Sequence, residues 1–190
     1  MGSSSQFCHN GNGRQIISAD EDCRPGRMKQ LLIVYHTRTG GTRQMVQAAA
    51  TGATRASSLD VRLESASDCG PDSLLAASGY LFACPENLAA MSGLMKDFFD
   101  RCYYPVLERL QGRPYAMLIC AGSDGSNAAR QIERIATGWR LRQIAPPLIV
   151  CTAAQTSEEI LQPKVIAATD LARCEELGAT LAAGLELGVF

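Results

Sequence analysis

A loop rich in hydroxyl and glycine residues follows the apolar run 31–35; it consists of Thr37, Arg38, Thr39, Gly40, Gly41 and Thr42. The backbone amides at a helix start lack partners, and the helix dipole favours an anion there. The glycines let the backbone approach a ligand closely. The loop lacks the Gly-Lys-Ser/Thr ending of a triphosphate-binding loop and does not match GxGxxG. It therefore predicts a monophosphate site, the alternative being a plain turn with Thr42 as the helix N-cap.

A second polar segment follows the apolar run 80–84 and contains Pro85, Glu86, Asn87 and Leu88, with Met91 slightly further along. Proline ends the strand because it has no backbone donor. Polar groups beside aliphatic side chains suit a planar amphipathic ligand, which needs partners for its rim and contact for its ring face. The alternative is an ordinary strand–helix connection capped by Ser92.

A third small, polar loop follows the run 115–120 and contains Ala121, Gly122, Ser123, Asp124 and Gly125. Alone it is a weak signal, since Asp124 or Ser126 could simply cap the next helix. Three such loops after three buried strands are much less probable by accident than one, so we expect them to form one site.

The elements that must position these loops alternate along the chain. Apolar runs predict strands at 31–35, 59–63, 80–84, 115–120 and 147–151. Helical spacing predicts helices at 42–54, 71–77, 92–104, 127–138 and 170–187. This α/β pattern predicts a three-layer, doubly wound, five-stranded parallel sheet. Ligands of such sheets bind beyond the carboxyl ends of the strands, where all three loops would lie.

Composition limits the classes of function. Residues 1–27 are polar and Gly/Ser-rich, which predicts a flexible extension before a domain at 28–190. The net charge of −1 and the lack of a basic cluster argue against nucleic acid. No apolar run is long enough for a membrane span. The 8 cysteines form no CxxC pair, which favours reduced thiols, a cytoplasmic location and no metal site.

The loops resemble those of the flavodoxin-like family. TRTGGT resembles its phosphate loop, and PENLAAMSGLMKDFFD resembles the FMN-dependent NAD(P)H:quinone oxidoreductases of the Trp-repressor-binding-protein type. The resemblance covers about residues 29–190 and implies non-covalent FMN. Residues 37–42 would hold its phosphate, 85–88 would run along the isoalloxazine, and 121–125 would close the other side. The flavin would carry the chemistry, so no side chain is assigned as catalytic.

Departures from the family bear on activity. Neither flavin loop has an aromatic residue, and the net charge is only −1, whereas electron-carrier flavodoxins enclose the flavin between aromatic residues and have strongly acidic surfaces. This favours an oxidoreductase that takes hydride from NADH or NADPH and passes it to a quinone-like acceptor. The alternatives are an electron carrier or FMN-binding module, and an FMN-less domain that binds an anion. The short segment after Gly125 lacks the long insertion that helps quinone reductases of the Trp-repressor-binding-protein type form tetramers, which argues against that specific reaction and that tetramer. A homodimer or a higher homo-oligomer is the alternative assembly.

Several neighbouring residues have two interpretations. His36 is more simply a packing residue than a phosphate sensor. Arg38 would meet the cofactor phosphate or the second phosphate of a nicotinamide nucleotide, or be a solvated loop residue. The aromatic residues Trp139, Tyr103 and Tyr104 suit packing or subunit contacts. Cys84 and Cys120 would lie close to the site, where small apolar filling is expected more than a redox role.

Overall fold

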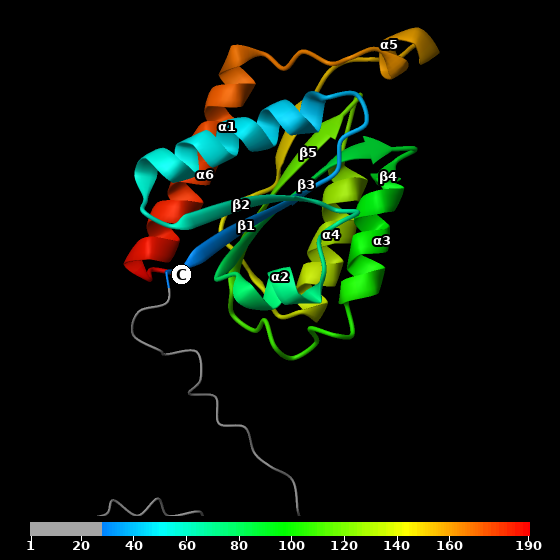
Figure 1. Ribbon diagram of the computed structural model, residues 1–190. Coiled ribbons are helices and arrows are strands. Elements are labelled where there is room, and N and C mark those ends of the chain that lie inside the picture. The colour runs from blue at the N-terminus through cyan, green and yellow to red at the C-terminus, as the bar shows by residue number, and fades with distance from the viewer. Residues whose placement is uncertain (1–27) are drawn as a thin grey trace, which may run out of the picture.

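The computed structural model describes residues 28–190, and the predicted extension 1–27 lies outside the described residues. Strands and helices alternate along the chain, as predicted (Figure 1). The strands are β1 (Gln30–Tyr35), β2 (Asp60–Ser65), β3 (Gly79–Asn87), β4 (Ala90–Met91), β5 (Pro114–Ala121), β6 (Arg142–Gln143) and β7 (Leu148–Cys151). The helices are α1 (Gly41–Ala56), α2 (Pro71–Ala76), α3 (Gly93–Cys102), α4 (Ser126–Gly138), α5 (Ser157–Leu161) and α6 (Ala168–Leu187).

The main sheet is parallel, with the order β2-β1-β3-β5 and a fifth position beside β5. That position is shared by β6, which pairs with the start of β5, and β7, which pairs with its end. Pro146 and Pro147 lie between the two pieces, and proline cannot donate to a ladder. The predicted doubly wound parallel sheet is confirmed, although its last strand is interrupted.

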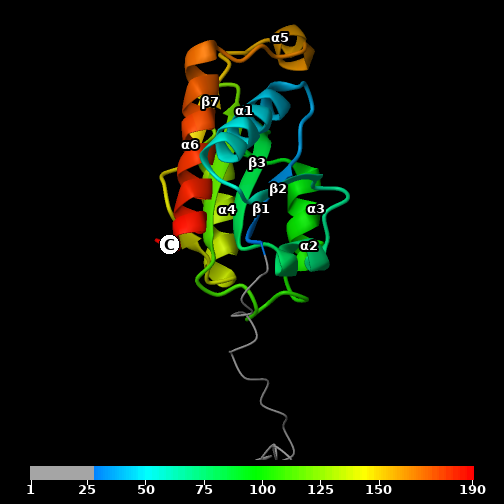
Figure 2. The same ribbon diagram turned by 60° about the vertical axis from the view of Figure 1, so that its left-hand side comes forward.

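Two pairs of helices enclose the sheet: α1 and α6 cover one face, and α3 and α4 cover the other (Figures 1 and 2). Helices α1 and α6 touch closely because both present glycine at their contact. A Cβ on Gly52 would lie 2.0 Å from the Glu175 carbonyl oxygen, and one on Gly178 would lie 2.0 Å from that of Ala49. Larger residues would push this layer apart, so the glycines set the position of α1.

The other face carries an aromatic cluster beneath α3 and α4. Trp139 is buried, its ring stacks on Tyr103 at 5.9 Å, and its Nε1 donates a hydrogen bond to the Tyr103 carbonyl oxygen. Phe82, Phe98 and Phe99 complete the cluster. The packing role predicted for Trp139 and Tyr103 is therefore confirmed.

Besides the short β6, two elements were not predicted. Strand β4 folds back on the end of β3 as an antiparallel hairpin, pairing Glu86 with Met91. Helix α5 begins with a capping box, in which Thr156 Oγ1 accepts from the Glu159 amide and the Glu159 carboxylate accepts from the Thr156 amide. Both elements follow the carboxyl ends of strands, so both bear on the predicted site.

The chain ends beside the start of the sheet. Lys29 Nζ donates a 2.7 Å hydrogen bond to the carbonyl oxygen of Leu185 near the end of α6. Within residues 28–190, none of the helices combines the length and apolar character needed to cross a membrane.

Candidate functional site

The β1–α1 loop is shaped as a helix start. Gly40 is the N-cap of α1, with a φ of 87°, and its amide donates to Thr37 Oγ1 at 3.2 Å. The interpretation of Thr42 as the N-cap is wrong, because Thr42 lies inside the first helical turn. Thr42 is 1% exposed, and its Oγ1 makes no hydrogen bond of ordinary geometry among the described residues, although the Cys120 thiol, a weak partner, interacts with it. A buried hydroxyl with only a weak partner is costly, so this atom calls for an acceptor beyond the protein.

Gly41 brings this loop onto the end of β5. A Cβ at Gly41 would lie 2.7 Å from Cys120 Sγ and 3.3 Å from the Lys164 Cβ. Burial raises the pKa of the Cys120 thiol to about 11, although the positive charge of Lys164 opposes the rise. The thiol therefore stays neutral near pH 7 and serves as a small apolar support for the loop.

The hairpin at the end of β3 turns through two left-handed residues, Leu88 (φ 51°) and Ala89 (φ 58°). Two residues with positive φ form a type I′ turn, in which Asn-Gly is the usual pair. The hairpin is held from α4: Asn127 Nδ2 donates to the Ala89 carbonyl oxygen at 2.5 Å, and Gln131 Oε1 accepts from the Met91 amide at 2.9 Å. These contacts hold Leu88, which is fully exposed, in a strained backbone.

The third loop is tied directly to the second. The Gly125 amide donates a 3.0 Å hydrogen bond to Glu86 Oε2. Gly125 is also the N-cap of α4, with a φ of 79°, so the predicted caps are wrong. Ser126 instead donates to Asp124 Oδ2. Ser92 is the N-cap of α3, as expected, although its hydroxyl makes no capping bond. One carboxylate, Glu86, thus fixes the spacing between the second and third loops.

The three loops meet at a cavity of about 410 Å³ at the carboxyl edge of the sheet. Nine of the predicted residues line it: Arg38, Thr39, Pro85, Glu86, Asn87, Leu88, Ala121, Gly122 and Ser123. Within residues 28–190 no cluster of three His, Cys, Asp or Glu side chains could hold a metal. The chemistry available at the cavity is that of hydroxyls, amides and a few charges.

The remaining predicted residues do not line the cavity wall. Thr37 and Gly40 belong to the β1–α1 loop, Gly41 and Thr42 to the first turn of α1, and Asp124 and Gly125 support the third loop. Met91 is 5% exposed and belongs to the buried core cluster that also contains residues of α3 and α4. We therefore assign Met91 to the core rather than to the cavity.

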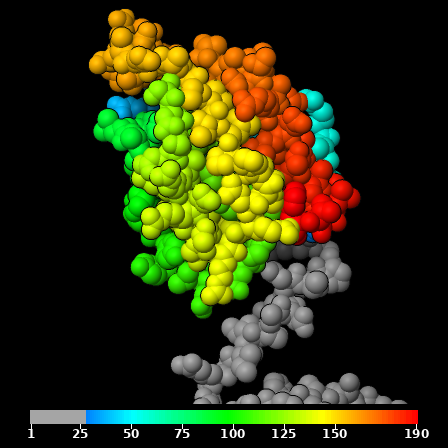
Figure 3. Space-filling model, turned by 180° about the vertical axis from the view of Figure 1, so that it is seen from behind, coloured from blue at the N-terminus to red at the C-terminus, as the bar shows by residue number. Residues whose placement is uncertain are grey.

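Six further residues line the cavity outside the predicted set: Cys120, Thr152, Ala154, Ile160, Leu161 and Lys164. Most belong to the segment between β7 and α6, residues 152–167, which we call the strap. Figure 3 shows α5 (orange) projecting above the body of the molecule, close to the β1–α1 loop (blue). The Thr-x-x-Glu pattern at Thr156 was a usable signal for α5. No local sequence pattern indicated that the strap contacts the β1–α1 loop.

His36 stands at the end of β1, and its amide donates to the Ala83 carbonyl oxygen. Its Nδ1 is buried without a hydrogen-bond partner among the described residues. Burial lowers the pKa of the imidazole, and the positive charge of Arg38 lowers it further. His36 is therefore neutral at pH 7.

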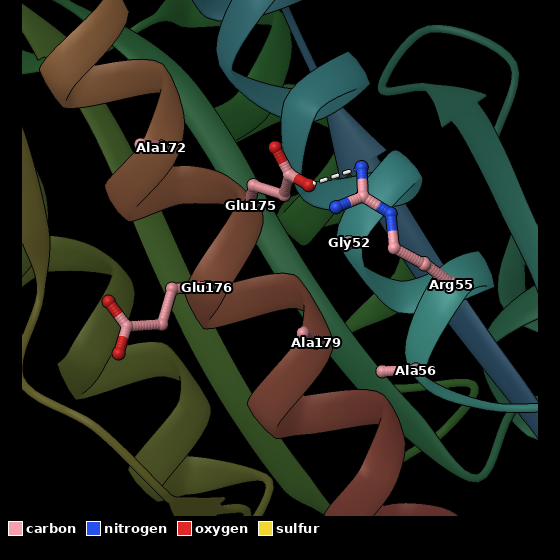
Figure 4. Close-up of a pocket in the computed structure, with 7 residues that line it drawn as sticks. All are labelled: Gly52, Arg55, Ala56, Ala172, Glu175, Glu176 and Ala179. Atoms are coloured by element: carbon pink, nitrogen blue, oxygen red, sulfur yellow. Dashed lines mark ion pairs between the residues drawn. The ribbon is translucent and has the colours of Figure 1, made fainter.

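A second hollow of about 360 Å³ lies between α1 and α6, away from the strand ends (Figure 4). Arg55 and Glu175 form an ion pair of 2.6 Å at this hollow. Alanine and glycine make up most of the rest of its lining. An exposed ion pair contributes little to stability and does not by itself mark a ligand site. We therefore attribute this hollow to the close packing of two helices around small residues.

Comparisons with known proteins point to the same fold. A family model described as NADPH-dependent FMN reductase matches residues 71–155. A flavodoxin of Aquifex aeolicus (strain VF5) is 34% identical over 96 residues, and the match spans 50% of this chain and 50% of that protein.

Solved structures extend the likeness over most of the chain. A flavodoxin from the domain Archaea has a TM-score of 0.64 and 21% identity, covering 82% of this chain and 98% of that one. A flavodoxin, WrbA-like protein from Agrobacterium tumefaciens has a TM-score of 0.63 and 20% identity, covering 84% of this chain and 98% of that one. Rubredoxin oxygen:oxidoreductase from Desulfovibrio gigas gives 0.67 and 14%, covering 84% of this chain and 37% of that one. The fold is therefore flavodoxin-like.

Proposed function

We propose that this chain binds FMN without a covalent bond and acts as an NAD(P)H-dependent oxidoreductase with a quinone-like or similar small acceptor. FMN, when bound, supplies the chemistry, since its ring system takes hydride from a reduced nicotinamide and passes reducing equivalents onward. The protein binds the cofactor, orients it and controls which molecules reach it.

The β1–α1 loop fits a phosphate monoester. The first amides of α1 have no acceptor within the helix, and the dipole of α1 favours an anion there. The buried Thr42 Oγ1 has at most the weak Cys120 thiol as a partner among the described residues, and a phosphate oxygen would be a stronger one. Thr37 and Thr39 add further hydroxyls, while Arg38 is exposed at the rim, where a nucleotide phosphate could meet it.

The other two loops fit a planar ring system. Pro85 to Leu88 form one wall of the cavity, and Ala121 to Ser123 form the other. The bond between Glu86 and the Gly125 amide fixes their separation. A cavity of about 410 Å³ falls within the range of about 300–1,000 Å³ typical of small-molecule sites.

The observation that favours a reductase is the lack of an aromatic side chain among the described residues that line the cavity. None of the described residues that line the cavity is Phe, Tyr or Trp. Trp139 and Tyr103 are committed to the core beneath α4. A ring held between small and aliphatic side chains keeps an accessible face, which stacking by a nicotinamide or a quinone requires. No side chain is assigned as a proton donor or acceptor.

A second candidate is an electron carrier or FMN-binding module without nucleotide turnover. The similarity to flavodoxins in sequence and in fold favours it. The two candidates differ in whether a nicotinamide nucleotide reduces the bound flavin.

The experiment begins with purified protein reconstituted with FMN and freed of excess cofactor. Visible absorption tests binding, and a colourless protein would exclude both candidates in favour of an anion-binding domain. Anaerobic mixing with NADH or NADPH then separates them. Bleaching within seconds supports the reductase, whereas flavin that stays oxidised with both nucleotides supports the carrier.

A further inference from the structure

The side chain of Gln44, on the first turns of α1, joins two segments that are far apart in the sequence. Its Nε2 donates to the Lys164 carbonyl oxygen at 2.6 Å and to that of Gly40 at 3.2 Å. Its Oε1 accepts from the Ile166 amide at 3.1 Å. The amide therefore pairs with the strap as a neighbouring strand would, while holding the N-cap of α1.

The strap also bonds directly to the β1–α1 loop. The Lys164 amide donates a 2.8 Å hydrogen bond to the carbonyl oxygen of Thr39. The Lys164 ammonium folds back onto α5, where it donates to the carbonyl oxygens of Glu159, Ile160 and Gln162. The backbone of Lys164 is thus bonded to the β1–α1 loop, while its ammonium group lies at the end of α5, beside the cavity.

The charge of Lys164 acts at the cavity. Lys164 lines it together with Arg38 and Thr39, and its ammonium opposes the burial-driven rise in the pKa of Cys120. Arg38 is exposed to solvent, whereas Lys164 is partly buried. A partly buried cation is screened less by salt than an exposed one.

We propose that Gln44 is a positioning residue of the phosphate site, which fixes the strap on the β1–α1 loop and so places Lys164 as the cationic neighbour of a bound phosphate monoester. This inference rests on the proposed function for the identity of the ligand. On this proposal two segments form the phosphate site. The β1–α1 loop supplies hydroxyls and backbone amides, and the strap supplies the positive charge.

The test compares Gln44→Ala with Gln47→Ala, an exposed glutamine on the same helix. FMN and riboflavin are titrated into each apoprotein, because riboflavin has the same ring and no phosphate. Because Gln44→Ala removes the contacts of one side-chain amide, we expect this variant to bind FMN about tenfold more weakly than the wild type does. Riboflavin affinity should be unchanged, and Gln47→Ala should match the wild type with both ligands.

Lys164→Met and Lys164→Arg test the charge. Lys164→Met should weaken FMN binding by an amount that persists at high salt, because this cation is screened little, and should leave riboflavin binding unaffected. Lys164→Arg should restore most of the loss. Equal FMN affinity for the wild type and Gln44→Ala would overturn the proposal, as would equal losses for FMN and riboflavin in that variant, since general damage to the fold affects both.

A wild type that binds no FMN would refute the proposed function but leave the positioning role open to test. Amide hydrogen exchange in residues 162–167 is then measured with and without inorganic phosphate. Protection by phosphate in the wild type and in Gln47→Ala, but not in Gln44→Ala, supports the role of Gln44. Equal protection in all three, or protection in none, contradicts it.

Discussion

A Cβ atom on Gly41 would lie only 2.7 Å from Cys120 Sγ, so the first residue of α1 rests directly on the end of β5. The strap closes over the same point, with the Lys164 Cβ 3.3 Å and the Ile166 Cδ1 3.4 Å from that position. The loop therefore has a floor and a side wall that leave no room for a methyl group.

Gly41→Ala should destabilise the protein by about 1–3 kcal/mol through overpacking and should weaken FMN binding. The control is Gly93→Ala, because Gly93 is the first residue of α3 and a Cβ added there would meet no described atom within 4 Å. Urea unfolding measures both. Adding Cys120→Ala should recover part of the loss in Gly41→Ala, and full additivity would show that the two side chains do not meet.

Thr42→Val should have opposite effects on the free and the loaded protein. Valine removes a buried hydroxyl whose one partner among the described residues is the weak Cys120 thiol, so the apoprotein should keep or gain stability. FMN binding should weaken by about 1.5–3 kcal/mol, because a hydrogen bond to a charged group is lost. Thr51→Val, at an exposed position of the same helix, is the control for both measurements. Unchanged FMN affinity in Thr42→Val would contradict the phosphate assignment.

Ala89→Gly should stabilise the protein by about 1 kcal/mol, because Ala89 holds a φ of 58° that glycine adopts without strain. Ala90→Gly, at the next position but in strand β4, should instead lose about 0.5–1 kcal/mol. The midpoints of urea unfolding compare them. If both variants shift in the same direction, the turn is not strained as described.

Acid should weaken the fold through His36. Its pKa is lowered in the folded protein, so the unfolded chain binds the proton more readily. The stability contributed by neutral His36 is complete above the unfolded pKa of about 6.5 and falls as the pH drops from there towards the folded value. We expect His36→Gln to flatten this decline in unfolding free energy. An unchanged slope in His36→Gln would contradict this assignment.

Much of the fold was predictable because buried parallel strands have continuous apolar sequences that can be recognised locally. Leu31 to Val34 and Tyr115 to Cys120 are buried almost completely, and their continuous apolar character indicated this. The alternation of strands and helices then fixed the layers. The shared edge of the three loops followed from the parallel arrangement alone, without knowledge of any contact.

The hairpin and the strap escaped prediction for different physical reasons. Leu88 and Ala89 occupy left-handed turn positions that favour Asn and Gly, so no turn signal was present; Asn127 and Gln131 hold the turn from another element. The bonds of Gln44 to the strap join residues distant in sequence, and no periodicity encodes such a pairing. Local patterns reveal elements, while these contacts depend on how the elements come together.

The interrupted fifth position of the sheet has a consequence for association between molecules. A long, regular outer strand offers unpaired amides and carbonyls to any other strand. Here that border is split into pieces of 2 and 4 residues, with two prolines between them. The opposite border, β2, alternates Asp60, Arg62 and Glu64 with other residues. Both margins of the sheet therefore make poor templates for strand addition, which protects the protein from forming intermolecular β-structure.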